Sequence, residues 1–461
     1  MKFRGTIIAL AVALGLVGYV LWSEQRERRQ TQERASLARL VPIEREALTS
    51  LLFSHSGRRI TLENRGGRWV VSHPIMAACD PRTIATFLDT LQAARAEDNV
   101  GSGNLARYGL DAPAAQVHIV GPGETTHRLR FGSINPQQTL VYVMVDDSED
   151  VLLTTSSLLS YALRSDFGWR DKRMIDVDPS RIARMRFRAG NAGSLSVRRD
   201  AVGQWRSERG FPWRTDPVKT RDVLLKLASL EAVAVTAENK RDANKFGLGN
   251  RRFSAVLEYE GGRTAGDLVL GSARGEGSYH AMVPQKPEVF RVHSDVVTAM
   301  VEFTRDPRDR RLFPSFNPDH VTRVEVWSPT DRFILERRSR TRWVVASSQK
   351  QDSTFAIDPG KILGTLEKMA TLEVAAFPKA QPDSSLYEPP ELAVTLYGTD
   401  GILSGLRVGR KDPNGLNTFV SGIWDQAVTL VSPLTLLELP FDLDRLGTDE
   451  LEVPVDIDRG D

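Results

Sequence analysis

One short pattern occurs three times in this chain, and its spacing constrains the fold more than any other feature. Each copy has a tryptophan that ends a strand-like run, then a short loop, then an Asp-Pro pair. The copies are Trp69 with Asp80-Pro81, Trp205 with Asp216-Pro217, and Trp343 with Asp358-Pro359. Successive tryptophans are separated by nearly equal lengths of chain, each of the size of one ordinary domain. The sequence therefore predicts three tandem copies of one domain.

The Asp-Pro pairs carry the signals that begin a helix. An aspartate is a favoured N-cap because its carboxylate accepts a hydrogen bond from a free backbone N–H of the first turn. Proline suits the next position, where its missing N–H costs nothing. Apolar residues follow each pair at helical spacing, which predicts one main helix with one buried face in each copy. Three aspartates in register are also compatible with three active sites, but the helix-start signal favours a structural role, and we expect the tryptophans in the core.

The remaining runs recur in one order in each copy: three strands, the main helix, four strands and a short closing helix. The predicted fold class is α+β, with an N-terminal transmembrane helix followed by three tandem homologous α+β domains of mostly antiparallel strands. The predicted ranges are 1–22 for a membrane anchor, 23–40 for a helical stem or tether, 41–167, 168–304 and 305–447 for the three repeat domains, and 448–461 for an acidic tail.

Residues 6–22 contain no charged side chain. Their number lies within the range of about 17–25 residues that spans a bilayer as a helix. Tyr19 and Trp22 stand where aromatic rings favour the membrane interface. A cleaved signal peptide would need small residues before the cleavage site, and Val20, Leu21 and Trp22 do not supply them. We therefore expect an uncleaved single-pass anchor, followed by a polar segment that is either a helical stem or a flexible tether.

Flanking charge leaves the orientation of this anchor open. Lys2 and Arg4 favour an N-terminus in the cytoplasm, whereas the arginines that follow the anchor favour the opposite orientation. These arginines are Arg26, Arg28, Arg29 and Arg34.

The charge balance and the single cysteine argue against several classes of protein. The 461 residues include 61 basic and 59 acidic side chains, and a net charge of +2 gives no support to a nucleic-acid-binding protein. Cys79 is the one cysteine, so it cannot form an internal disulfide or supply a thiolate metal site by itself. The other two copies have Thr215 and Ile357 in its place, so the repeat does not require a thiol.

Motifs that would indicate catalysis are missing from the sequence. It has no Gly-x-x-x-x-Gly-Lys-Ser/Thr loop, no His-Glu-x-x-His and no Gly-x-Ser-x-Gly. His118 and His127 flank the turn at Gly121 and could face each other across a hairpin, but a metal site needs further ligands. The matching hairpins of the other copies contain no histidine. We therefore assign no catalytic, cofactor-binding or metal-binding residue and expect no cofactor.

Two further marks recur along the chain. The first is Tyr108-Gly109-Leu110, which matches Phe246-Gly247-Leu248, whereas the third copy has Leu386-Tyr387-Glu388. The second is a glycine that ends a strand, at Gly132, Gly271 and Gly409. Such a glycine is typical of a turn or bulge that needs a positive φ, and we expect that conformation here.

This pattern resembles a bacterial family of membrane-anchored proteins that contain a domain of unknown function, number 4340. The resemblance is carried by Gly67-Arg68-Trp69, Asp80, Tyr108-Gly109-Leu110-Asp111-Ala112-Pro113 and Leu129-Arg130-Phe131-Gly132. Members of this family are typically encoded beside permease subunits of gliding-motility-type ABC exporters, and their soluble part is thought to face away from the cytoplasm. No catalytic residues are assigned to the family, so the resemblance adds no site residue.

The anchor and the resemblance together imply a single-pass protein of the inner (cytoplasmic) membrane with its domains outside the cytoplasm. We expect a non-enzymatic scaffold or accessory subunit of an ABC-type export or cell-envelope machine, with the membrane and an ABC-type permease subunit as partners. One alternative is an extracytoplasmic binding module for envelope glycan or peptide. Phe211 and Trp213, in a loop before Asp216, would favour it if they are exposed, although core packing is the simpler explanation. Another alternative is a hydrolase whose site the sequence does not reveal.

Overall fold

A computed structural model describes residues 39–42, 44–209, 213–275, 277–313, 316–349, 355–378, 382–423 and 428–448. The expected anchor, nearly all of the expected stem and nearly all of the acidic tail lie outside these residues. Within the described ranges, no helix is both long enough and apolar enough to cross a membrane. One compact unit ends at Arg173 and a second begins at Met174. The second unit contains the second and third repeats.

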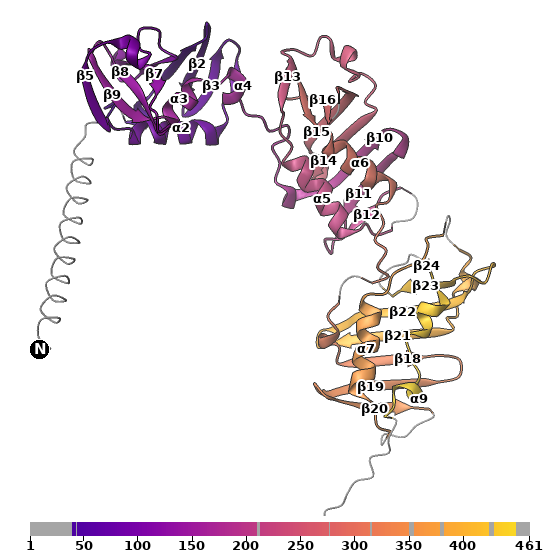
Figure 1. Ribbon diagram of the computed structural model, residues 1–461. Coiled ribbons are helices and arrows are strands. Elements are labelled where there is room, and N and C mark those ends of the chain that lie inside the picture. The colour runs from indigo at the N-terminus through magenta and orange to yellow at the C-terminus, as the bar shows by residue number, and fades with distance from the viewer. Residues whose placement is uncertain are drawn as a thin grey trace, which may run out of the picture. The chain divides into compact units, whose positions relative to one another are not determined.

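The first unit contains one antiparallel sheet and the helices that cover it (Figure 1). In spatial order its strands are β4 (Ala77–Ala78), β3 (Arg68–His73), β2 (Arg58–Arg65), β1 (Ser50–His55), β6 (Ala115–Val120), β7 (Thr126–Ile134), β8 (Leu140–Val145), β9 (Asp150–Thr155) and β5 (Asp98–Ser102). Its α-helices are α2 (Pro81–Ala93), α3 (Ser157–Ala162) and α4 (Asp166–Trp169).

The second and third repeats keep the same central strand order. The second sheet runs β12 (Trp205–Ser207), β11 (Ser194–Arg199), β10 (Ile182–Ala189), β14 (Phe253–Tyr259), β15 (Thr264–Ala273), β16 (Ser278–Met282), β17 (Val289–His293) and β13 (Ala234–Ala237). The third runs β20 (Arg342–Ser348), β19 (Arg332–Ser339), β18 (Arg323–Trp327), β21 (Leu392–Gly398), β22 (Gly401–Lys411), β23 (Thr418–Gly422) and β24 (Val428–Val431). Their α-helices are α5 (Pro217–Ala228), α6 (Asp295–Arg305), α7 (Pro359–Ala370), α8 (Pro433–Leu437) and α9 (Leu443–Leu446).

Short 3-10 helices occupy several of the connections. They are η1 (Arg45–Ala47), η2 (Leu105–Tyr108), η3 (Pro122–Glu124), η4 (Pro179–Arg181), η5 (Gly190–Ala192), η6 (Ala243–Phe246), η7 (Glu260–Gly262), η8 (Pro318–His320) and η9 (Ser384–Leu386). The sheets are antiparallel throughout, so the predicted α+β class with repeated, mostly antiparallel domains is confirmed for the described residues.

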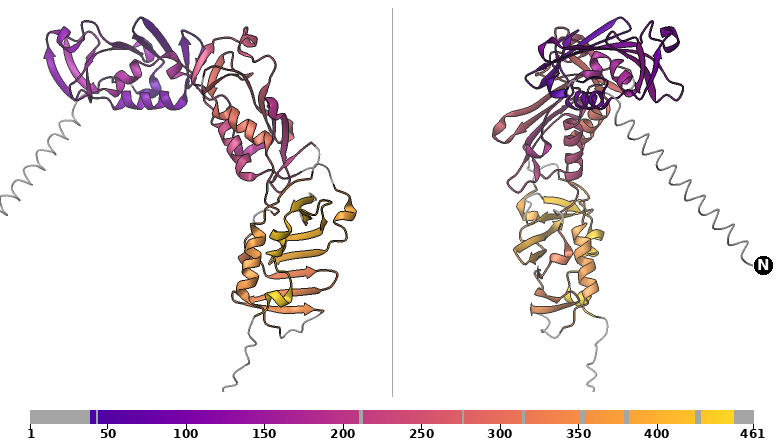
Figure 2. Two further views of the ribbon diagram at one scale, coloured as in Figure 1. Left: turned by 45° about the vertical axis from the view of Figure 1, so that its right-hand side comes forward. Right: turned by 90° about the vertical axis from the view of Figure 1, so that its left-hand side faces the viewer.

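Each main helix covers one face of its own sheet, which we call the inner face (Figure 2). In the first domain, Phe87 and Leu91 of α2 pack with Leu51, Phe53 and other buried residues of the strands. Ile362 and Leu366 of α7 do the same in the third. Alternate residues along each strand point to this core, because successive side chains of a strand point to opposite faces.

The three aspartates cap the main helices, as predicted. Asp80 Oδ2 accepts a hydrogen bond from the Thr83 amide at 3.0 Å. Asp216 Oδ1 accepts one from the Val218 amide at 2.8 Å, and Asp358 Oδ1 accepts one from the Gly360 amide at 2.8 Å. Proline is the first residue of each helix. The recurring Asp-Pro pair is therefore a structural signal.

Backbone hydrogen bonds at the same place close each domain. The amides of the three cap aspartates donate to carbonyls of the closing segment: Asp80 to Trp169 at 2.8 Å, Asp216 to Pro307 at 2.9 Å, and Asp358 to Leu446 at 2.9 Å. Trp169 is fully buried in the first core, although residues 168–304 were predicted to form the second domain. The first domain therefore extends to Arg173, because its closing segment completes its core.

The recurring glycines correct one expectation. Gly132, Gly271 and Gly409 lie at β-bulges, but their φ angles are not positive. A Cβ added to them would collide with the carbonyl oxygens of Tyr108, Phe246 and Leu386, respectively. The glycines allow two backbone segments to approach closely. The two recurring motifs are therefore in contact: the strand glycine of each copy packs against the segment that begins with Tyr108, Phe246 or Leu386.

Candidate functional site

The face of each sheet opposite the main helix, which we call the outer face, divides into two halves. Over one half lies the segment that contains η2 or η6 in the first two domains. There Leu110 packs with Met144 and Val151, and Leu248 packs with Val269. Over the other half, on the first three strands of each repeat, the side chains are largely polar, and no described helix of that domain covers them. This open half is the candidate functional surface.

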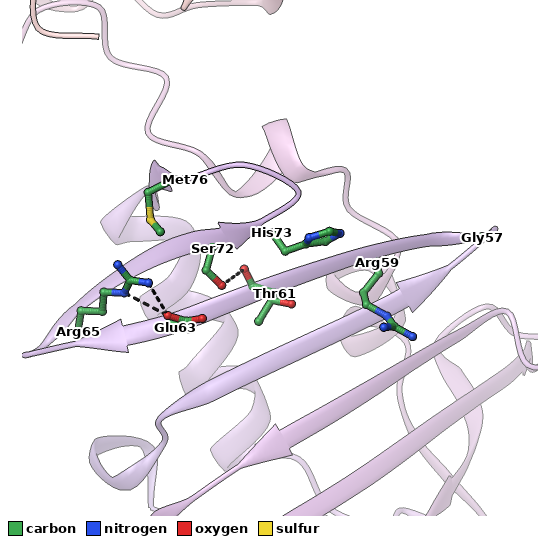
Figure 3. A pocket seen from close by; sticks show the side chains of 8 residues that line it. All are labelled: Gly57, Arg59, Thr61, Glu63, Arg65, Ser72, His73 and Met76. Atoms are coloured by element: carbon green, nitrogen blue, oxygen red, sulfur yellow. Dashed lines mark hydrogen bonds and ion pairs between the residues drawn. The ribbon is translucent and has the colours of Figure 1, made fainter. Parts of the chain in front are cut away.

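In the first domain the open half is a groove of about 650 Å³ along β2 and β3. Figure 3 shows Arg59, Thr61, Glu63 and Arg65 in a row along β2, with Ser72 beside them. His73 and Met76 complete the rim, and 54% of Met76 is exposed. The groove therefore combines cationic, hydroxyl and apolar groups.

Three hydrogen bonds order the floor of this groove. Arg65 donates to Glu63 Oε2 through Nη2 at 2.8 Å and through Nε at 3.1 Å, and Ser72 Oγ donates to the Thr61 carbonyl at 3.4 Å. The hydrogen bonds and the charge of Arg65 lower the pKa of Glu63 despite its partial desolvation. Glu63 is thus a carboxylate at neutral pH, and its charge is matched by Arg65.

The structure separates His118 and His127, the two histidines of the β6–β7 hairpin. His118 pairs with Arg128 across the β6–β7 hairpin, whereas His127 pairs with Ile119. Their side chains therefore lie on opposite faces of the sheet, because the register is offset by one residue from the symmetric pairing. His127 instead contacts Asp146, with 2.8 Å between Nδ1 and Oδ2. Burial, and then the charges of Arg128 and Arg59, lower the pKa of His118.

In the second domain the open half carries four arginines that we call the arginine ladder: Arg184, Arg186, Arg188 and Arg198. The first three alternate along β10 with the buried residues Met185 and Phe187, so they share the outer face. Arg198 of β11 pairs directly with Arg184.

Two glutamates hold part of this ladder in place. Arg184 donates to Glu208 Oε2 at 2.6 Å and to Glu258 Oε2 at 3.3 Å. Arg186 also donates to Glu258, whose side chain is 6% exposed. The guanidinium of Arg198 lies 3.6 Å from Glu208. These contacts fix the guanidinium groups on the sheet, because each Arg–carboxylate pair constrains the planes of both groups.

The pKa of Glu208 reflects the same contacts. Burial alone would raise it, but the hydrogen bonds from Ser196 and Arg184 and the charges of Arg184 and Arg198 outweigh burial and lower it. Glu208 is therefore ionised across the physiological pH range.

The third domain has a different set of side chains at this place. Arg323 forms an ion pair with Glu325, and Tyr397 Oη donates to Glu325 Oε2 at 3.0 Å. Burial, and then the hydrogen bond and charge of Glu325, raise the pKa of Tyr397. The three outer faces therefore share a position in the fold but not a chemistry.

The described side chains on the three open halves form neither a metal site nor a nucleophile site. Within the part of the chain that the structure describes, no three histidine, cysteine, aspartate or glutamate side chains are grouped to hold a metal ion. Burial, and then the charge of Asp80, raise the pKa of the Cys79 thiol to about 12, so it is not a thiolate at neutral pH. The open halves present hydrogen-bonding and charged groups at the surface.

Trp213 lies where the second and third repeats meet, inside the second compact unit. The guanidinium of Arg308 lies 5.2 Å from the Trp213 ring centre and 4.9 Å from that of Phe377. Nearby, Arg214 Nε donates to Asp309 Oδ2 at 3.1 Å in a buried ion pair. Trp213 is thus half-buried in a packed junction, while Phe211 lies outside the described residues.

The arginine ladder was not predicted from the sequence, although its signal is visible there. Arg184, Arg186 and Arg188 alternate with apolar residues in one strand, which places all three on one exposed face. The matching strands of the other copies have Ser50, Leu52 and Ser54, and Arg323, Glu325 and Trp327. Comparison of the three copies position by position would have found it.

Solved structures give no functional guide. A DNA polymerase sliding clamp from Pseudomonas aeruginosa, determined with a ligand, is 10% identical over 86% of this chain and 94% of that chain, with a TM-score of 0.17. A DnaN sliding clamp (DNA polymerase III subunit beta) from the same organism, bound to griselimycin, is 9% identical over 87% and 94%, with a TM-score of 0.14. Scores this low carry no argument about fold or function. No curated protein matches the chain.

The family comparison is informative. The model of a domain of unknown function (DUF4340) matches residues 69–250 and again residues 205–389. The two matches overlap, together span well over half of the chain, and start at the first and second recurring tryptophans. The chain therefore belongs to the DUF4340 family.

Proposed function

We propose that this protein is a membrane-anchored, extracytoplasmic scaffold or accessory subunit of an ABC-type export or cell-envelope machine, and that it is not an enzyme. The observation that carries the proposal is the contrast between the inner and outer faces of the three repeats. The inner faces repeat the same cap, core and closing contacts, whereas the outer faces differ in their polar side chains. Repeated domains with different open surfaces are suited to holding several partners at once.

The chemistry of the outer faces supports binding over catalysis. Their ionisable groups are arranged as ion pairs, such as Arg65 with Glu63 and Arg323 with Glu325. A nucleophile needs an adjacent base and a group that orients that base. The ion pairs instead fix charged side chains in place, which serves recognition.

The uncharged segment at residues 6–22 supports attachment to a membrane. A single helix cannot form a transport path, because substrate and buried backbone need a bundle or barrel around them. The segment would therefore act by attachment, for which a permease subunit is the natural partner.

A second candidate function rests on the groove of the first domain. Its volume of about 650 Å³ and its mixture of Arg59, Thr61, Ser72 and Met76 fit a polar envelope glycan or peptide. This binding function is compatible with a scaffold and would be one of its contacts.

Topology is tested with alkaline phosphatase or a green fluorescent protein fused to the C-terminus of the full chain. We expect phosphatase activity and no fluorescence, together with retention in the membrane pellet after carbonate extraction. As a control, the same reporters are fused directly after the stem, in a chain that lacks the three domains. Fluorescence with an inactive phosphatase, or a mature N-terminus near residue 23, would contradict the placement.

A further inference from the structure

We propose that the arginine ladder of the second domain binds an extended acidic segment of a partner protein. The inference deepens the proposed scaffold function and rests on it, because it assigns one outer face to one class of partner.

The ladder has more positive charge than the acidic groups beside it neutralise. Glu208 and Glu258 are the carboxylates that contact three of its four arginines, namely Arg184, Arg186 and Arg198. Arg188 forms no side-chain hydrogen bond or ion pair within the described ranges, and Arg186 and Arg198 are about half exposed, at 47% and 53%. The surplus charge is therefore accessible to an anionic partner.

Three of the four guanidinium groups, those of Arg184, Arg186 and Arg198, already contact carboxylates in this setting. Glu258 is nearly buried between Arg184 and Arg186, and Glu208 accepts hydrogen bonds from Arg184 and Ser196. These contacts restrict the arginine rotamers before any partner arrives, which lowers the entropy cost of binding. Arginine is also suited to planar, bidentate recognition of carboxylates.

The spacing of the ladder favours a polypeptide. Arg184, Arg186 and Arg188 are two residues apart on one strand, so their Cα atoms repeat at roughly 6.8 Å. Side chains on one face of an extended peptide have the same repeat. Alternating glutamates or aspartates would therefore meet successive arginines without a change of register.

Serine residues lie on both sides of Arg188 in the sheet. Ser194 and Ser254 pair with Arg188 from the two neighbouring strands, one on each side. Both lie on the outer face with it, because directly paired residues of antiparallel strands share a face. Ser194 is exposed and offers a polar contact beside a carboxylate bound to Arg188, whereas Ser254 is buried.

The ladder is specific to one repeat. The equivalent strand positions hold Ser50, Leu52 and Ser54 in the first domain and Arg323, Glu325 and Trp327 in the third. One chain should therefore bind one acidic segment at this place.

Fluorescence anisotropy on the full chain in detergent tests this proposal. The probe is a fluorescein-labelled peptide in which glutamate and threonine alternate, and the comparison peptide has the same composition with its glutamates contiguous. We expect one site per chain, tighter binding of the alternating peptide, and weaker binding as salt is raised. Equal affinity for the two peptides would overturn the argument from spacing.

Charge variants locate the site. Arg188→Glu should weaken binding at least about tenfold, because an attractive contact becomes a repulsive one. Arg221→Glu, the same charge change on the exposed side of α5, should weaken it less than about twofold. The double variant Arg186→Gln with Glu258→Gln removes a whole ion pair and leaves no buried charge unmatched; it should also weaken binding. Equal effects of Arg188→Glu and Arg221→Glu would overturn the assignment.

A competition experiment with lipid vesicles distinguishes binding of an acidic peptide from binding of a lipid. Vesicles that contain phosphatidylglycerol should compete with the alternating peptide only weakly. If they bind through Arg188 while the peptide does not bind, the ladder is a lipid site and the proposal is wrong. If neither binds but the chain still purifies with a permease subunit, this inference fails while the scaffold proposal stands.

Discussion

Glu208 is the residue whose ionisation most clearly connects the outer face to stability. Its pKa is lowered in the folded protein, so its carboxylate stabilises the native state at a pH above the ordinary glutamate pKa of about 4.3. That contribution is lost as the pH falls through the lowered pKa, because the protonated group no longer accepts charge-assisted hydrogen bonds from Arg184 and Ser196.

We therefore predict that Glu208→Gln lowers the urea midpoint of the second domain at neutral pH. The difference from the unsubstituted protein should begin to shrink as the pH falls below the ordinary glutamate pKa of about 4.3, and it should vanish below the lowered pKa of the folded protein, where Glu208 is protonated in both states. Circular dichroism across a pH series measures this. A difference that stays constant with pH would mean that the side chain acts by shape and not by charge.

The glycine at each β-bulge matters at the level of elements, because it lets η2 or η6 approach the neighbouring strand. We predict that Gly271→Ala destabilises the protein by about 1–3 kcal/mol or more, since the new methyl group would collide with the Phe246 carbonyl. Thermal melting of the full chain gives the measurement.

Gly364→Ala is the matched control for this change. Gly364 lies inside α7 with no atom within 4 Å of the added methyl group. The control should therefore stabilise the protein by roughly 0.5–1 kcal/mol, as alanine does in a helix. Similar effects of the two substitutions would show that the close contact at Gly271 is not present in solution.

Local signals allowed most of the element order to be predicted. The Asp-Pro caps and the apolar spacing act within one helical turn, so the sequence alone contains them, and the structure confirms them at Asp80, Asp216 and Asp358. The conformation of the recurring glycines was predicted wrongly, because a glycine needed for close approach and one needed for positive φ look alike in a sequence.

Features that depend on pairing between strands were beyond such signals. The faces of His118 and His127 depend on hairpin register, which the loop sets. The burial of Trp169 in the first core depends on contact with residues far away in the sequence. Prediction of the arginine ladder requires one strand to be compared among the three copies. Prediction of its ion pairs with Glu208 and Glu258 also requires the order of the strands in the sheet.

At the level of the whole molecule, three domains share one framework and differ in the surface that they present. Family membership adds no chemistry, since the matching domain has no known function. We therefore propose that the chain acts by holding partners at a membrane.

Purification of the tagged full chain in mild detergent, followed by mass spectrometry of the intact assembly, tests that claim most directly. We predict a permease subunit and its ATPase in fixed ratio with the chain. A chain whose residues 1–22 are replaced by a cleavable secretion signal should fold but lose them, while Arg221→Glu should retain them. A full chain that purifies without either subunit in every detergent, or that turns over a substrate by itself, would contradict the account.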